Sequence, residues 1–121
     1  MGKTILFVYG TLKRGGRGNR WLATQRFVSE AVTEPKYRLY DLGTYPGLVK
    51  DESTGLAVKG ELWEVDDACL AELDDYEYAP DLYSRERIRV QGTDGPVETF
   101  LYNKPIPAAA RSGDFWPFPA A

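Results

Sequence analysis

The stretch that decides the fold is Thr4-Ile-Leu-Phe-Val-Tyr-Gly-Thr-Leu-Lys-Arg-Gly-Gly-Arg-Gly18, where an apolar run ends abruptly in a glycine-bearing polar loop. Ile5 to Val8 are large and apolar without clean alternation, which is typical of a strand buried on both faces. At Gly10 the backbone can take a φ denied to other residues, and a ligand can approach it closely. Amides in such a turn can converge on a carboxylate, a phosphate or an oxyanion. We therefore place the function here; an ordinary strand followed by a glycine-rich turn is the alternative.

The same loop does not fit either common phosphate-binding motif. Gly10 and Gly15 have the outer spacing of a Walker loop, but Gly16 and Arg17 stand where that motif needs Lys and then Ser or Thr. A dinucleotide fingerprint that begins at Gly16 would require its third glycine at the position of Trp21. The sequence therefore excludes both readings.

Length and charge predict one ordinary domain over residues 1–121 that does not bind nucleic acid. The net charge is −3, which leaves no overall electrostatic footprint for nucleic acid. We interpret the local basic run at Lys13, Arg14, Arg17 and Arg20 as a solvated face, with a weak anion or nucleic-acid site as the alternative. No apolar run approaches the roughly 20 residues that a membrane span needs. Because Met1 leads almost at once into the first strand, we expect no signal peptide and a cytoplasmic location.

The chain contains no histidine, and this fact restricts its chemistry most. Ser-His, Cys-His and His-metal chemistry are all excluded. The lone Cys69 cannot form an internal disulfide and lies in a helical pattern, which favours a small buried residue. Any catalysis must therefore use carboxylates, Tyr, Lys or backbone amides, and we expect no metal site.

Dense turn signals between short apolar segments and one good helix predict a mostly antiparallel α+β domain, in which a closed barrel would leave few free strand edges. A short helix is expected over 19–26 and a longer one after an N-cap at Asp66 or Asp67. The predicted strands after the first cover 27–32, 37–42, 48–50, 56–65, 83–91 and 97–101. Residues 103–121 form a tail rich in proline and aromatic residues, which must pack on the barrel or meet a partner.

Two glutamates are candidates for functional carboxylates. Leu70, Leu73 and Glu77 lie at i, i+3 and i+7, so a carboxylate continues the buried stripe of the longer helix. Burial raises a carboxyl pKa, which tunes it as a general base. The alternative is that the helix frays before Glu77 and turns this side chain into solvent. Glu61 shares a strand face with Trp63, although its charge favours an edge or surface position.

The turn around Tyr45, Pro46 and Gly47 is the second candidate wall of a ligand site. A rigid proline-containing turn with an aromatic side chain can border a small ligand. A plain turn whose tyrosine packs on the core is the alternative reading.

In combination these segments resemble the γ-glutamylcyclotransferase-like superfamily, close to its γ-glutamylamine cyclotransferase and AIG2-like branch. The resemblance covers nearly the whole chain. It rests on the order and spacing of short motifs: Tyr9-Gly-Thr-Leu12, Tyr45-Pro-Gly47, Val58-Lys-Gly-Glu-Leu-Trp63, Leu73-Asp-x-Tyr-Glu77, Tyr83-Ser-Arg85 and Ser112-Gly-Asp-Phe-Trp116. One departure is that Tyr78 follows Glu77, where the family more often has Glu-Gly.

The resemblance implies a small mixed, mostly antiparallel β-barrel with flanking α-helices. It also implies a ligand cavity at the mouth of this barrel and a reaction in that cavity. In that family the α-amine of a γ-glutamyl group attacks its own γ-carbonyl, which gives 5-oxoproline and a free amine. Glu77 matches the catalytic glutamate, and no cofactor or metal is implied. The matching substrate-binding residues are Tyr9, Gly10, Thr11 and Leu12, with Tyr45, Pro46 and Gly47 as the second wall.

Two readings from other classes stay open at this point. The chain could be a non-catalytic module that binds an amino-acid-like anion through the same loop. It could instead be a protein-interaction barrel that uses its aromatic tail. The sequence leaves open the identity of the leaving amine and whether the protein is a monomer or a homodimer.

Overall fold

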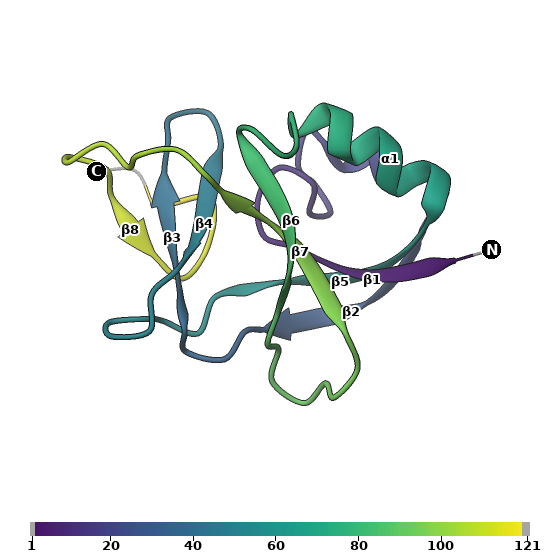
Figure 1. The fold of residues 1–121 in the computed structure, drawn as a ribbon, viewed down its shortest axis with the longest axis horizontal. Helices are drawn as coiled ribbons and strands as arrows, with labels where there is room; N and C mark the ends of the chain where they lie inside the picture. The colour runs from purple at the N-terminus through teal and green to yellow at the C-terminus, as the bar shows by residue number, and fades with distance from the viewer. Residues whose placement is uncertain (1, 120–121) are drawn as a thin grey trace.

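The computed structural model describes residues 2–119 and shows one curled sheet with a single α-helix in that part of the chain. Figure 1 shows β3, β4 and β8 on one side, β1, β2 and β5 on the other, and β6 and β7 between them. The elements are β1 (Lys3–Val8), η1 (Asn19–Leu22), β2 (Arg26–Val32), β3 (Tyr37–Asp41), β4 (Pro46–Lys50), β5 (Lys59–Asp66), α1 (Asp67–Tyr76), β6 (Tyr83–Ile88), β7 (Val97–Tyr102) and β8 (Ser112–Gly113).

The sheet is mixed and mostly antiparallel, as the sequence predicts. Its strand order is β2-β5-β1-β7-β4-β3-β8, with β6 paired to β7. Only the pairs β1–β7 and β4–β7 are parallel. An isolated bridge between Thr33 and Val90 brings the end of β2 back towards the end of β6. Because an isolated bridge and not a continuous ladder joins these two strands, the barrel expected from the sequence is a curled half-barrel.

Strand β7 holds the sheet together because three strands pair with it. Strand β6 follows β7 along its whole length, from Tyr83 opposite Tyr102 to Ile88 opposite Val97. Strand β1 pairs near one end of β7, at Glu98, and β4 pairs near the other, at Leu101. The sheet thus forks at β7, and the loop that follows β1 lies where the two branches separate.

The buried side chains form two clusters, and successive residues of β1 alternate between them: Leu6 and Val8 belong to one and Phe7 to the other. One lies under α1 and includes Leu6, Leu22, Val65 and Leu73, all fully buried. Helix α1 packs there against β1, β5 and η1 (Figure 1). The other joins β3, β4, β5 and β7; it contains Phe7, Tyr9, Leu39, Leu48, Leu62 and Leu101.

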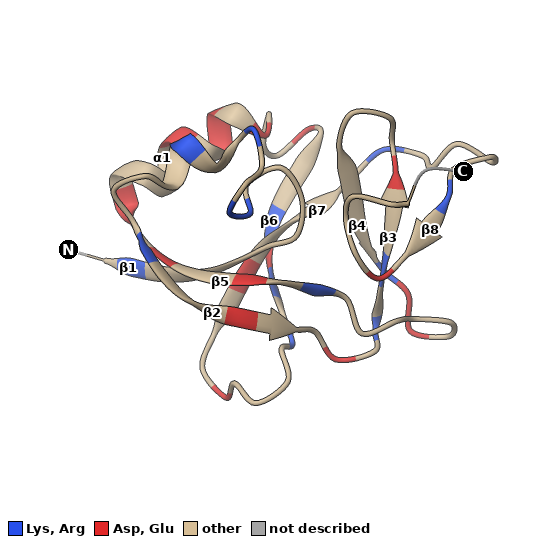
Figure 2. Cartoon of the chain, turned by 180° about the vertical axis from the view of Figure 1, so that it is seen from behind, with Lys and Arg blue, Asp and Glu red and all other residues tan. Residues whose placement is uncertain are grey.

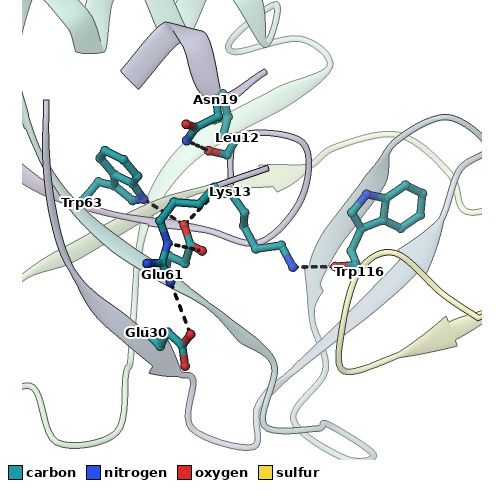
Figure 3. Close-up of polar contacts among 8 residues, drawn as sticks. Leu12, Lys13, Asn19, Glu30, Glu61, Trp63 and Trp116 are labelled. Carbon is teal, nitrogen blue, oxygen red and sulfur yellow. Dashed lines mark hydrogen bonds and ion pairs between the residues drawn. The ribbon is translucent and has the colours of Figure 1, made fainter. Parts of the chain in front are cut away.

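The tail packs on the second cluster through Trp116 and Phe118, whose rings meet edge to face at 5.8 Å. Phe115 stays 46% exposed and lies 3.9 Å beneath the Lys13 ammonium. Lys13 also donates a hydrogen bond to the carbonyl of Trp116 (Figure 3). The tail is therefore part of the fold and holds the loop that follows β1.

Several predicted element bounds are wrong, each for a local reason. The helix expected over 19–26 is the 3₁₀ turn η1, since Gly18 supplies no side-chain cap and β2 begins at Arg26. The strand expected from residue 56 begins at Lys59, where pairing with β2 starts. The strand expected to end at residue 91 ends at Ile88, because its later residues form the isolated bridge to Thr33.

Candidate active site

A cavity of about 280 Å³ opens at the fork between the two branches of the sheet. The loop after β1, the start of β4, the end of α1, and β6 with β7 supply its walls. The lining residues are Phe7, Val8, Tyr9, Gly10, Thr11, Leu12, Arg17, Tyr45, Pro46, Tyr76, Glu77, Tyr78, Leu82, Tyr83 and Phe100. Six of the seven predicted binding residues therefore surround one cavity together with Glu77.

Gly10 is required by packing, not by the φ that the sequence suggested. Its φ is not positive; among the glycines of residues 2–119, positive values occur at Gly15, Gly43 and Gly92. A Cβ at position 10 would lie 2.6 Å from Cγ of Pro46, closer than real Cβ contacts come. The absence of a side chain lets the loop after β1 lie directly on the first residue of β4.

The loop that lines the cavity leaves backbone N–H groups available for a ligand. Within residues 2–119, the amides of Gly10, Thr11 and Leu12 donate to no protein acceptor. The loop turns back on itself beyond them, because Lys13 N–H donates to the Gly10 carbonyl at 3.1 Å. Successive amides of this kind bind an anion or a developing oxyanion.

Glu61 fixes this loop from beneath, and its predicted edge or surface position is wrong. It lies on β5, between β2 and β1, and its residue is 7% exposed. Its carboxylate accepts from Arg14 N–H at 3.0 Å, Arg14 Nε at 3.2 Å and Trp63 Nε1 at 3.1 Å (Figure 3). Burial pushes the pKa of Glu61 upward, but these donors outweigh it and lower that pKa.

Two buried tyrosines hold the walls of the cavity in place. Tyr9 donates from its hydroxyl to the Phe100 carbonyl at 2.6 Å and accepts from Leu48 N–H at 3.4 Å. Tyr83 donates to the Pro46 carbonyl at 2.7 Å. Burial raises the pKa of both hydroxyls, and the nearby Glu77 carboxylate adds to this effect. Both hydroxyls therefore stay protonated, and their hydrogen bonds connect the segments that form the cavity walls.

Helix α1 begins where the sequence predicts and does not fray before Glu77. Asp66 is the N-cap, and its carboxylate accepts from Cys69 N–H at 2.8 Å. Leu70 and Leu73 are buried on the face turned towards the core. The amide of Glu77 donates to the Leu73 carbonyl at 2.9 Å, so the helical bonding reaches this residue.

The helix ends in a Schellman motif that turns the chain just after Glu77. Tyr78 N–H donates to the Asp75 carbonyl at 3.1 Å, and Ala79 N–H donates to the Asp74 carbonyl at 2.9 Å. Glu77 is the C-cap residue, and Tyr78 takes the left-handed position with φ +54°. The motif fixes the backbone that carries the Glu77 carboxyl, which therefore lines the cavity.

The Glu77 carboxyl has the properties of a general acid and base. Burial raises its pKa from the ordinary 4.5 to about 7. Within residues 2–119 no side chain forms a hydrogen bond or ion pair with it. Near neutral pH the protonated and ionised forms of the Glu77 carboxyl are both populated, and neither form is held by a side-chain hydrogen bond or ion pair within residues 2–119.

Of the predicted residues, only Gly47 does not line the cavity. A Cβ there would lie 2.8 Å from Cβ of Tyr102 and from a methyl carbon of Leu42, so this glycine allows β4 to pack closely. Its neighbours Tyr45 and Pro46 do form a wall. Tyr78 and Tyr83 also line the cavity and were not predicted to do so, although Tyr83 begins the motif Tyr83-Ser-Arg85.

Arg17, which was predicted to lie on a solvated face, also lines the cavity. Figure 2 shows basic positions along the loop after β1. Arg17 is exposed and donates to the Thr44 carbonyl at 2.7 Å. It therefore links the two loops that border the mouth of the cavity.

Cys69 is buried in α1, with its Sγ 3.4 Å from the Trp21 carbonyl, and burial raises its pKa to about 11. It is a packing residue. Within residues 2–119 no group of three or more acidic or cysteine side chains is arranged to hold a metal ion. No helix in the same residues is both long and apolar enough to cross a bilayer.

Comparison with known proteins gives a consistent result. Residues 6–116 match the protein family described as "Gamma-glutamyl cyclotransferase, AIG2-like". The chain is 39% identical to the gamma-glutamylaminecyclotransferase of Bos taurus over 106 residues, which cover 80% of this chain and 63% of that protein. It is 33% identical over 101 residues to the gamma-glutamylcyclotransferase family protein YtfP of Escherichia coli K12, with 84% of each chain covered.

Solved structures share the fold. A crystal structure of an AIG2-like protein from Mus musculus superposes with a TM-score of 0.75 and 30% identity, covering 90% of this chain and 82% of that one. The uropathogenic E. coli protein c4763 superposes with a TM-score of 0.80 and 26% identity, covering 94% and 90%.

Proposed function

The chain belongs to the AIG2-like γ-glutamyl cyclotransferase family, and we propose that it releases 5-oxoproline and a free amine from a γ-glutamyl amine or γ-glutamyl amino acid. Glu77 is the general acid and base. One observation carries this proposal: an unpaired carboxyl with a pKa of about 7 lines the same cavity as the amides of Gly10, Thr11 and Leu12. The substrate is a small molecule, and the chemistry uses only side chains and backbone amides.

The raised pKa of Glu77 matches the first step, in which the α-ammonium group of the substrate must lose a proton. An α-ammonium group is a weaker acid than a carboxylic acid, and each unit of difference between the two pKa values costs about 1.4 kcal/mol. Burial raises the pKa of Glu77 from 4.5 to about 7. The proton transfer to Glu77 is therefore about 3 kcal/mol less costly than transfer to an ordinary carboxylate.

The neutral amine then attacks the γ-carbonyl carbon of the same molecule, and a tetrahedral oxyanion forms. The free amides after Tyr9 can hold this oxyanion or the α-carboxylate; one such donor contributes roughly 3–4 kcal/mol where it has been measured. Because nucleophile and electrophile belong to one molecule, a cavity that holds the substrate folded supplies much of the acceleration.

The intermediate collapses when its bond to the leaving nitrogen breaks. Glu77 returns a proton to that nitrogen, so the leaving group departs as an amine. Overall two protons pass from the attacking nitrogen to the leaving nitrogen, which becomes an ammonium group in water. One carbon–nitrogen bond forms and one breaks, so the atoms balance without a co-reactant.

The test is release of 5-oxoproline from a panel of γ-glutamyl compounds by the wild type and by Glu77→Gln. We expect Glu77→Gln to lower kcat/KM at least about 100-fold, because an amide can neither take nor return the proton. Glu72→Gln is the matched control: Glu72 is exposed on the same helix and should keep full activity. Full activity in Glu77→Gln with intact folding would refute the assignment of Glu77.

The pH dependence of kcat/KM gives a second measurement. Activity should fall about tenfold per pH unit below a pKa near 7, where Glu77 becomes protonated in the free enzyme. An acidic limb near pH 4.5 would show that the active carboxyl is not Glu77. Tight calorimetric binding of γ-glutamyl compounds without turnover over hours would favour the non-catalytic binding module.

A further inference from the structure

Tyr78 occupies a conformation that its own side chain disfavours. Its φ of +54° lies in the left-handed region, and in residues 2–119 it is the only non-glycine residue with a positive φ. Left-handed backbone crowds the Cβ of an ordinary residue, and a bulky aromatic residue there is an outlier. The Schellman motif needs this conformation at position 78, but glycine or asparagine would supply it at lower cost.

The ring of Tyr78 does not compensate for this cost by packing. The residue is 70% exposed, the most exposed of the large apolar side chains in the described part of the chain. Tyr76, two residues earlier, stacks on Trp21 with ring centroids 5.3 Å apart. Within residues 2–119 no ring stacks on Tyr78 in this way. The fold therefore uses the backbone of Tyr78 and leaves its side chain at the surface.

Tyr78 is nevertheless one of the residues that line the cavity, directly after Glu77. Glu77 must reach the leaving nitrogen to return a proton to it, so this nitrogen lies beside the end of α1. The γ-glutamyl half lies towards the amides of Gly10 to Leu12, which serve its oxygens. The body of the leaving group must then extend from Glu77 towards the mouth, where Tyr78 and Arg17 stand.

We propose that Tyr78 determines specificity: its ring forms the outer wall of a leaving-group subsite and favours amines with an aromatic or branched apolar body. This rests on the proposed function, which sets the direction in which the substrate lies. An exposed ring beside a bound apolar group gains contact area only when the ligand is present. The preferred substrate class is a γ-glutamyl amino acid with a large apolar side chain.

Three variants separate the role of the ring from that of the backbone. Tyr78→Gly and Tyr78→Asn keep the left-handed turn and remove the ring, whereas Tyr78→Phe keeps the ring. We expect both ringless variants to raise Tm, by about 2–4 °C for the glycine variant, because the backbone strain is relieved. Stabilisation together with a selective loss of activity is a combination that a purely structural tyrosine would not give.

The probes are γ-glutamyl-phenylalanine, γ-glutamyl-leucine and γ-glutamyl methylamide, whose leaving group has almost no body. For the two amino-acid compounds, the ringless variants should lose about tenfold in kcat/KM, through KM rather than kcat. For the methylamide the change should stay below about twofold. Tyr78→Phe should keep the wild-type preference. Equal ratios among the three compounds in wild type and Tyr78→Gly would overturn the proposal.

Binding measurements distinguish failure of this inference from failure of the proposed function. Calorimetry in the Glu77→Gln background, with and without Tyr78→Gly, reports the subsite without turnover. If the wild type releases no 5-oxoproline, but Tyr78→Gly weakens binding of γ-glutamyl-phenylalanine about tenfold relative to the methylamide, the subsite stands and the catalytic proposal falls. If wild-type turnover is normal and neither affinity nor KM depends on the ring, only the subsite falls.

Discussion

The glutamates Glu61 and Glu77 lie in different surroundings, and their pKa values move in opposite directions. Burial acts on both in the same sense, against the charged form. Glu61 accepts hydrogen bonds from Arg14 and Trp63, which overcome this effect and keep it ionised. Glu77 has no such donors, and its pKa rises to about 7. The difference teaches that hydrogen-bond donors set against burial distinguish a structural carboxylate from one that burial alone tunes to exchange protons.

The largest effect on stability is expected when Glu61 is removed. Glu61→Ala leaves Trp63 Nε1 and two N–H groups of Arg14 without their acceptor, which should cost about 2–4 kcal/mol of unfolding free energy. Urea denaturation measures this loss of unfolding free energy. Glu64→Ala is the control, since Glu64 is on the same strand and pairs only with the exposed Arg26. Equal losses of unfolding free energy in Glu61→Ala and Glu64→Ala would mean that the Glu61 network contributes no more stability than an exposed ion pair.

Glu77→Gln should have the opposite effect on stability, and only at higher pH. Because the pKa of Glu77 is raised in the folded state, its stabilising contribution is full below about pH 4.5 and is lost as pH rises through about 7. The glutamine variant lacks this loss, so it should exceed the wild type by up to about 3 kcal/mol at pH 8. The two should converge near pH 4. A constant difference in Tm across this range would contradict the assigned pKa.

Gly10→Ala tests the contact between the two branches of the sheet and should have the smallest effect. The new methyl group would lie 2.6 Å from Cγ of Pro46, and the resulting shift should cost about 1–2 kcal/mol. Because the adjoining amides line the cavity, KM should rise as well. Gly95→Ala is the control, since nothing lies within 4 Å of its added Cβ. Unchanged KM and stability in Gly10→Ala would show that the loop adapts freely.

The sequence was informative where local pattern determines structure. The apolar run of β1, the N-cap at Asp66 and the buried stripe of α1 are all features of consecutive or helically spaced residues. The position of Glu77 beside the loop after β1 followed from the resemblance and from that stripe. The glycine at position 10 was identified as special, although its reason is the ring of Pro46 and not the backbone angle.

The sequence failed where the answer depends on which strands become neighbours. Alternation correctly placed Glu61 on the face of Trp63, but it could not show that β5 lies between β1 and β2. Arg17 reaches the cavity only because its loop folds back through bonds such as the one from Gly18 N–H to the Thr11 carbonyl. Tyr78 was not predicted as a lining residue because a tyrosine gives no sequence signal of a left-handed backbone conformation.

The fork at β7 has a consequence for the order in which the molecule assembles. Tyr9 and the Phe100 carbonyl that it bonds are 91 positions apart in a chain of 121 residues. Closing so long a loop is slow compared with forming α1 or a hairpin. The cavity should therefore be among the last features to appear during refolding, after most secondary structure is in place. Recovery of ligand binding would then report completion of the native topology more faithfully than recovery of the far-ultraviolet circular dichroism signal.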